Sequence, residues 1–284
     1  MPDGTSVGIA AAQRAGTARS PRVPRLPDQL SVNFGPAEAI GRVVLATDFA
    51  VRSHGIRLSM STDFEELAHV NEINRSDWRP LMANFDVQHS TVDEQNAFWV
   101  KGIDARGDVV LCHAVRLYVF GTTTLKDELE SLRFFYERPE TAIANGASVE
   151  VTAPGASAIK KRVSYSGALW VRSDFRRGGL TRLITPLSHA LAVTRWYPSY
   201  HTCSLTQPVV EKGVAKLYGY RHVQYAVWLR NLPGLPVDLK TALCWKTTDE
   251  VVLEIEERAS GELSRKRAAE TVSIAAREEN LVNA

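Results

Sequence analysis

The chain has 284 residues, of which 44% are apolar and 23% are charged, as in an ordinary globular protein of one or two domains. Its formal net charge of +2 supplies no bulk field that would attract nucleic acid or an anionic membrane surface. The sequence contains no apolar run of about 18 residues, so we expect no membrane-spanning helix.

The three cysteines, Cys112, Cys203 and Cys244, are odd in number, widely spaced and without a CxxC pair. This pattern favours neither a disulfide framework nor a zinc site. We therefore expect a cytoplasmic protein in a reducing compartment, with no metal ligands among its cysteines.

The first 30 residues are rich in arginine, alanine, serine and proline and poor in acidic residues. Such a composition fits either a disordered tail or an organelle targeting peptide. Pro21, Pro24 and Pro27 would interrupt the amphipathic helix of a targeting peptide, so the tail is the favoured interpretation.

The first predicted strands and helix lie between residues 56 and 120. Alternating apolar residues over Ile56–Met60 predict a strand, and Ser61 or Thr62 is the expected N-cap of the helix that follows. The apolar runs Ala97–Ile103 and Val109–Phe120 predict two strands joined as a hairpin.

Residues 121–162 predict a helical insert before the next strand. The spacing of apolar residues over Leu125–Glu137 is typical of a helix. The Gly-, Ala- and Ser-rich stretch 144–161 is expected to form a loop or a weak strand around Val149–Val151.

Strands and helices alternate in the second half of the chain. The predicted order is a strand at Val163–Val171, a helix at Leu180–Trp196, a strand at Tyr200–Leu205, a short helix at Glu211–Tyr218 and a strand at Val223–Leu229. This order predicts an α/β domain over 31–245 with a mixed sheet. Residues 246–284 form a charged extension, in which Glu262–Glu279 suit a solvated helix or a disordered tail.

The turn between the predicted strand at Val163–Val171 and the helix at Leu180–Trp196 carries the strongest chemical signal. Free N–H groups and the dipole at a helix start attract anions, and glycine lets the backbone approach a ligand closely. An ordinary strand–turn–helix junction would have the same glycines, but the flanking arginines favour a phosphate cradle. Its candidate residues are Arg176, Arg177, Gly178, Gly179, Leu180, Thr181 and Arg182.

Two motifs resemble those of the GNAT acyltransferase superfamily. The turn matches the phosphate-loop pattern Arg/Gln-x-x-Gly-x-Gly/Ala as Arg176-x-x-Gly179-x-Thr181, with Thr in place of Gly or Ala. The segment 215–220, with Tyr218 followed by Gly219, resembles the motif that ends the family's domain, although the family's Asn near the start of that helix is Glu211 here. The resemblance covers 165–230, extends over 56–120 only in the order of elements, and fails over 121–162.

The resemblance implies a GNAT-type mixed, mostly antiparallel sheet flanked by helices, with the insert between the third and fourth strands. It implies acetyl-CoA or another acyl-CoA as cosubstrate and a small-molecule or peptide amine as acceptor. In the family the fourth strand diverges from its neighbour and binds the pantetheine arm, a role that falls here on Leu169, Trp170 and Val171. The family's closing tyrosine protonates the departing thiolate, which makes Tyr218 the candidate general acid.

The general base has no clear candidate in the sequence. The predicted fourth strand holds no carboxylate, which leaves Glu150 in the preceding apolar patch and His113 in the middle of the hairpin. His201 and a Cys203 nucleophile are weaker alternatives, because a lone strand histidine or small buried cysteine is more often structural. Phe134, Phe135 and Tyr136 either line an acceptor pocket or acyl channel, or cover the sheet.

Two other functions stay open on the sequence. A long-chain N-acyl amino acid or autoinducer-type synthase would share this architecture and take its acyl chain from an acyl carrier protein. A non-catalytic CoA-binding module would explain the missing base. The sequence identifies neither the acceptor nor the oligomeric state.

Overall fold

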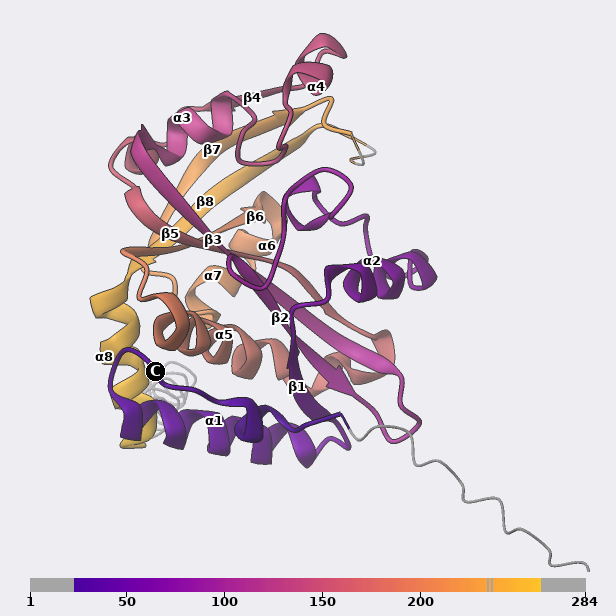
Figure 1. The fold of residues 1–284 in the computed structure, drawn as a ribbon, viewed down its shortest axis with the longest axis vertical. Coiled ribbons are helices and arrows are strands. Elements are labelled where there is room, and N and C mark those ends of the chain that lie inside the picture. The colour runs from indigo at the N-terminus through magenta and orange to yellow at the C-terminus, as the bar shows by residue number, and fades with distance from the viewer. Residues whose placement is uncertain (1–22, 234, 236, 262–284) are drawn as a thin grey trace, which may run out of the picture.

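The computed structural model of the protein describes residues 23–261, except 234 and 236. Eight of its strands form one sheet in the order β1-β2-β3-β5-β6-β8-β7-β4 (Figure 1). Neighbouring strands pair antiparallel, with β5 and β6 as the one parallel pair in this described sheet. The predicted fold class, a mixed and mostly antiparallel sheet flanked by helices, is confirmed.

Most predicted strands fall close to their expected bounds, whereas β4 was expected only as a loop or weak strand and β8 was not predicted. The strands are β1 (Arg57–Ser61), β2 (Ala97–Ile103), β3 (Val109–Thr124), β4 (Ser148–Val151), β5 (Lys160–Val171), β6 (Tyr200–Thr206), β7 (His222–Arg230) and β8 (Leu239–Thr247).

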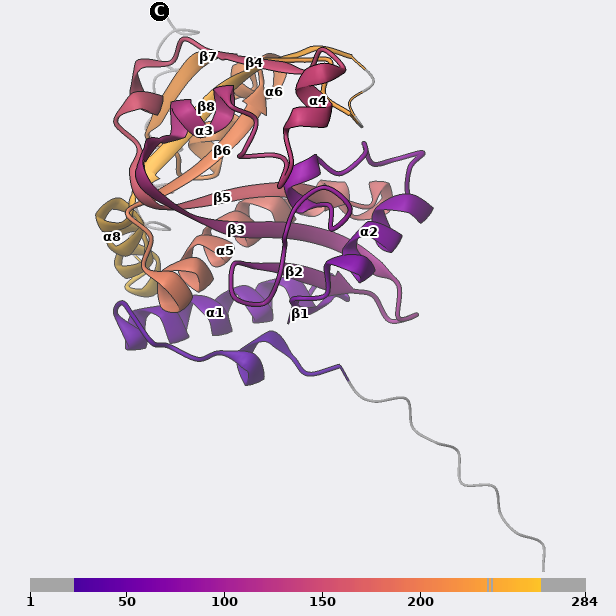
Figure 2. The same ribbon diagram turned by 45° about the horizontal axis from the view of Figure 1, so that its top comes forward.

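Three helices cover one face of the sheet: α1 (Ala37–Arg52), α5 (Leu180–Trp196) and α8 (Thr248–Ala259) (Figure 2). Their apolar side chains form a common core with strand residues such as Val115. Helix α1 was not predicted, although its buried residues recur at helical spacing. Helix α8 lies within the expected C-terminal extension and packs against α1 and α5.

The opposite face is covered by α2 (Phe64–Ile73) and the 121–162 insert. The N-cap of α2 is Asp63, whose side chain accepts a hydrogen bond from the Glu66 amide. The prediction that Ser61 or Thr62 caps this helix was therefore wrong. The insert is only partly helical, with α3 (Leu125–Glu130) and α4 (Glu140–Ala144) before the edge strand β4.

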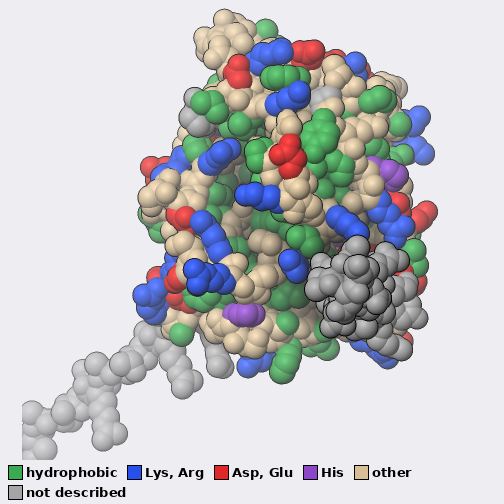
Figure 3. All heavy atoms as spheres, turned by 180° about the vertical axis from the view of Figure 1, so that it is seen from behind, with side chains coloured by type: hydrophobic (Ala, Val, Ile, Leu, Met, Phe, Trp, Pro, Cys, Tyr) green, Lys and Arg blue, Asp and Glu red, His purple; other side chains and the backbone are tan. Residues whose placement is uncertain are grey.

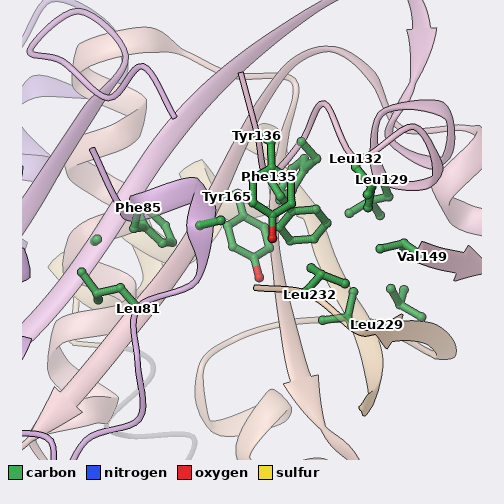
Figure 4. Close-up of a cluster of buried hydrophobic side chains, with 14 of the residues drawn as sticks. Leu81, Phe85, Leu129, Leu132, Phe135, Tyr136, Val149, Tyr165, Leu229 and Leu232 are labelled. Carbon is green, nitrogen blue, oxygen red and sulfur yellow. The ribbon is translucent and has the colours of Figure 1, made fainter. Parts of the chain in front are cut away.

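The insert aromatics belong to the hydrophobic core. Phe134, Phe135 and Tyr136 are at most 5% exposed and pack around Tyr165 of β5 (Figure 4). The predicted helix Leu125–Glu137 ends at Glu130 because the chain reverses at Leu132, which has a φ of 61°. Of the two interpretations left open, these side chains therefore cover the sheet.

The parallel pair opens into a fork. Strands β5 and β6 are in register only from Val163↔Tyr200 to Tyr165↔Thr202. Beyond Tyr165, β6 continues along β8 as far as Thr206, while β5 follows β3 through a bulge at Ala168, which has a φ of 50°. The acyltransferase resemblance implied this divergence for the family's fourth strand, which corresponds to β5 here.

The two predicted tails lie mostly outside the described residues, at 1–22 and 262–284. Residues that follow the first of them are held on the domain, since Leu26 is buried and the Gln29 amide bonds the Met60 carbonyl. No helix in the described part of the chain is both long and apolar enough to cross a membrane.

Candidate active site

A cavity of about 580 Å³ occupies the fork between β5 and β6. Its walls are the end of β5, the end of β6, the loop 77–82 that follows α2, and the tip of the β7–β8 hairpin. Tyr218 and Thr181 line it from the side of the sheet that α5 covers. A hollow with hydrophobic side chains inside and Lys and Arg side chains around it opens on the face drawn in Figure 3.

The start of α5 has the properties of an anion cradle. Gly179 is its N-cap, with a φ of 65°, no side-chain cap and no acidic residue in the turn that follows. A Cβ added to Gly179 would meet nothing within 4 Å, so the backbone there faces open space. Arg177 and Arg182 are exposed beside it, and neither forms an ion pair with a residue that the structure describes.

Gly178 allows the turn to pack closely against a neighbouring side chain, whereas Gly179 faces open space. A Cβ at this position would lie 2.9 Å from the His54 ring at the end of α1. Asp174, the acidic residue within the segment that leads into the turn, is held by Arg172. The field at the start of α5 is therefore set by the helix dipole, Arg177 and Arg182.

Arg176 holds the turn closed. Its Nε donates to the Val171 carbonyl at 2.9 Å, and its Nη2 forms an ion pair with Asp77 of the loop 77–82. The arginine that the sequence assigns to phosphate binding is thus engaged by a carboxylate in this structure. It joins the end of β5 to the loop on the other wall of the cavity.

The predicted pantetheine strand lies along the cavity. Leu169, Trp170 and Val171 all line it, and Trp170 stacks on Trp78 with ring centroids 5.0 Å apart. Ala168 and Leu169 have no paired residue on β3, and within the described ranges no strand pairs with β5 on its other side beyond Tyr165. Backbone groups of Ala168 and Leu169 are therefore free for a ligand, whereas the Val171 carbonyl accepts from Arg176.

Tyr218 ends helix α7 (Val214–Leu217), and Gly219 after it has a φ of 81°. The expected helix at Glu211–Tyr218 is split, because α6 (Gln207–Glu211) ends before α7 begins. Burial raises the pKa of Tyr218, and a hydrogen bond with the Thr181 side chain opposes the rise. The phenol is therefore protonated at neutral pH, as a general acid must be.

The two candidate bases lie away from this cavity. His113 is buried against α5, where its Nδ1 lies 2.9 Å from the Ser188 hydroxyl and burial lowers its pKa to about 3. Glu150 is exposed on the edge strand β4 and forms an ion pair with Arg230. Neither lines the fork.

The weaker alternatives are also structural in their surroundings. His201 is buried between the hydroxyls of Ser164 and Thr248, and burial lowers its pKa well below its usual value. Burial raises the pKa of the Cys203 thiol, which does not favour a nucleophilic thiolate. No cluster of three His, Cys, Asp or Glu side chains in the described ranges could hold a metal ion.

Sequence reasoning missed the loop 77–82, which supplies Asp77 and Trp78 to the cavity. Asn71 fixes this loop, because its side-chain amide donates to the Arg79 carbonyl and its oxygen accepts from the Leu81 amide. No local pattern marks Asp77, whose partner Arg176 is 99 residues away in the sequence.

The protein is similar to known proteins in structure but not in sequence. No protein-family model and no curated protein matches the sequence. Arabidopsis thaliana NAA60 in complex with a bisubstrate analogue matches with 12% identity over 67% of this chain and 97% of its own, at a TM-score of 0.36. Mutant forms of the spermidine/spermine N-acetyltransferase SpeG from Vibrio cholerae match with 6% identity over 71% and 98%, at 0.41.

A third match is arylalkylamine N-acetyltransferase 2 from Aedes aegypti, with 12% identity over 68% of this chain and 99% of its own, at a TM-score of 0.38. All three TM-scores are low, so the assignment of a fold rests on this chain's own sheet and turn. The diverging parallel pair and the glycine turn at the start of α5 are features that the resemblance to the GNAT acyltransferases implied.

Proposed function

We propose that the protein transfers an acyl group from acetyl-CoA or another acyl-CoA to an amine acceptor, with the reaction centre in the fork between β5 and β6. The observation that carries the proposal is the fork cavity itself. It combines a turn suited to phosphate, a strand end with free backbone groups and a protonated tyrosine.

The donor would lie with its diphosphate at the start of α5. Open space at Gly179 supports this placement, and so do the cations Arg177 and Arg182, which no described carboxylate engages. The pantetheine arm would follow 168–171 into the fork, where Ala168 and Leu169 have no partner on β3. An amide-rich arm is suited to such a strand end because it can complete the missing backbone hydrogen bonds.

The chemistry would be a direct attack within the fork. The acceptor nitrogen forms a bond to the thioester carbonyl carbon, and N–H groups at the end of β5 stabilise the oxyanion. The carbon–sulfur bond then breaks, and Tyr218 gives its proton to the departing thiolate. The nitrogen, positively charged after its attack, loses its extra proton to the tyrosinate or to solvent, which leaves a neutral amide. The position of Tyr218 beside Thr181 suits this role, since Thr181 belongs to the first turn of α5.

The acceptor would enter as a neutral amine. Among the described residues that line the cavity, Asp77 is the one carboxylate, and Arg176 already engages it. An apolar cavity disfavours the ammonium form, so the amine would release its proton to solvent before it reaches the thioester.

Calorimetry of the full-length protein with acetyl-CoA tests the donor site. An Arg177→Glu, Arg182→Glu double variant is expected to weaken binding by about tenfold or more, because it replaces two cations beside the diphosphate with carboxylates. The matched control is Arg138→Glu, Lys160→Glu, which changes the net charge equally at exposed positions away from α5. Absence of binding by any CoA species to folded protein would refute the proposal.

Tyr218→Phe tests the acid. We expect kcat to fall by about 100-fold while acetyl-CoA affinity changes less than about twofold, since the ring remains and the transferable proton is lost. An unchanged kcat would assign thiolate protonation to another group. A non-catalytic CoA-binding module would bind CoA and show no turnover with any amine.

A further inference from the structure

The fork cavity has two chemically different halves. On the side of the sheet that α5 covers, its wall is polar and includes Thr181 and Tyr218. On the other side, its wall joins the core beneath α2 and the insert. Apolar side chains from two separate segments form that wall: Trp78, Leu81 and Met82 from the loop 77–82, and Leu229, Leu235 and Leu239 from the β7–β8 hairpin.

The cavity therefore runs through the sheet rather than along one face. A donor whose diphosphate lies at the start of α5 approaches the fork from the polar half. Whatever extends past the thioester carbon must occupy the apolar half, because that is where the cavity continues.

The charges in the lining oppose a polycation. The described lining contains one carboxylate, Asp77, and two guanidinium groups, Arg79 and Arg176. Asp77 is in ion-pair contact with Arg176, so an incoming ammonium finds no unpaired carboxylate among the described lining residues. An acceptor with several positive charges would leave them uncompensated beside a second cation.

The wall is also built before any ligand arrives. Asn71 holds the loop 77–82 through two hydrogen bonds, and Trp78 is stacked on Trp170 with an interplanar angle of 9°. On the hairpin side, the Leu235 amide bonds the Leu232 carbonyl. A preformed apolar wall binds an apolar group without first having to order its own side chains.

We propose that the apolar half of the fork cavity binds an alkyl or aryl group of a substrate, so that the protein acts on apolar chains or rings rather than on polyamines. This inference rests on the proposed acyl transfer. The apolar group has two sources, the acyl chain of the donor or the body of the acceptor amine, and both present the same chemistry to Trp78, Leu235 and Leu239.

Two substrate series distinguish the sources, both with the full-length protein. The first is calorimetry of acetyl-, butanoyl-, hexanoyl- and octanoyl-CoA. The second is the initial rate with acetyl-CoA and propylamine, hexylamine, octylamine, phenethylamine or spermidine. In the series that supplies the apolar group, affinity or kcat/KM is expected to rise by about fourfold per added methylene until the cavity is filled.

Variants of the hairpin locate the effect. Leu235→Glu is expected to abolish the chain-length dependence, and Leu235→Ala to reduce it while leaving the fold intact. The control is Val237→Glu in the same hairpin, at a position that is 62% exposed and outside the cavity lining. It should preserve the dependence.

The outcomes separate the inference from the proposed function. A rise in the acyl series assigns the apolar half to the donor chain, a rise in the amine series assigns it to the acceptor, and either supports the inference. Two flat series with intact acetyl-CoA binding, or a preference for spermidine over hexylamine, would overturn the inference alone. If no CoA species binds, the proposed function fails and the inference fails with it.

Discussion

Acid destabilisation through His113 is the prediction that the structure makes most quantitatively. The imidazole is 3% exposed, contacts the Ser188 hydroxyl, and has its pKa lowered by burial from 6.5 to about 3. Below pH 6.5 the unfolded chain binds a proton that the folded chain refuses, so stability is lost as the pH falls from 6.5 toward 3. At about pH 5 the loss from this one group amounts to about 2 kcal/mol.

Urea unfolding of the wild type and of His113→Gln measures this contribution. Glutamine keeps a hydrogen-bonding group near Ser188 and cannot titrate. The difference in unfolding free energy between the two proteins should therefore shrink by about 2 kcal/mol from about pH 7.5 to about pH 5. His201, whose pKa burial also lowers well below normal, contributes equally to both proteins, and His189 does so apart from the smaller effect that His113 has on its pKa.

Val115→Ala is the control, because Val115 is fully buried on the same face of β3 and does not titrate. It should lower stability by on the order of 1–3 kcal/mol equally at every pH. If the difference between wild type and His113→Gln changes by less than about 0.5 kcal/mol over the same range, the folded protein accepts the proton and the argument from burial is wrong.

Three further predictions concern charge. Glu254→Gln should lower the free energy of unfolding, measured in urea, by about 3 kcal/mol because it leaves the fully buried Lys246 without its carboxylate. The double variant Lys246→Met, Glu254→Leu should lower it much less, and equal losses in the two variants would contradict this reasoning. Asp77→Asn should tighten acetyl-CoA binding several-fold in calorimetry by releasing Arg176 for the diphosphate, and an unchanged affinity would show that Arg176 acts on the turn alone. The pH midpoint of kcat/KM should follow the pKa of the acceptor amine; one midpoint for amines of different pKa would instead indicate a base on the protein.

The elements around the donor site were predictable because their signals are local. Helix α5 runs over the predicted Leu180–Trp196, and the turn that precedes it ends at Gly179, as predicted. Strand β5 ends where the apolar run ends, at Val171. The order of these elements therefore followed from periodicity and turn residues alone.

The elements that escaped prediction depend on distant parts of the chain. Phe49 and Leu45 of α1 are 76% and 59% exposed, so apolar residues on both faces of that helix blur its period. Strand β8 lies between β6 and β7, and its central residues are buried without the alternation that marks a one-sided strand. Neither the packing of α1 nor the pairing of β8 can be inferred from nearby residues.

The base candidates show the same limit within the site. His113 and Glu150 were chosen by residue type and position along the chain, but the face of a strand and its place in the sheet decide what a side chain meets. His113 points into the core beneath α5, and Glu150 lies on the edge strand β4 at the far end of the sheet from β1. The parallel step from β5 to β6, which creates the fork, is a property of the whole sheet.

Thr181 shows why a departure from a family pattern has to be judged in its surroundings. A side chain larger than Gly or Ala in the phosphate turn suggests crowding, yet its hydroxyl interacts with Tyr218 on the same wall of the cavity. It thereby opposes the rise in the Tyr218 pKa that burial causes, and a lower pKa makes the phenol a better proton donor to a thiolate. The residue that departs from the family pattern would thus couple the donor site to its acid, and this coupling favours an enzyme over a passive CoA-binding module.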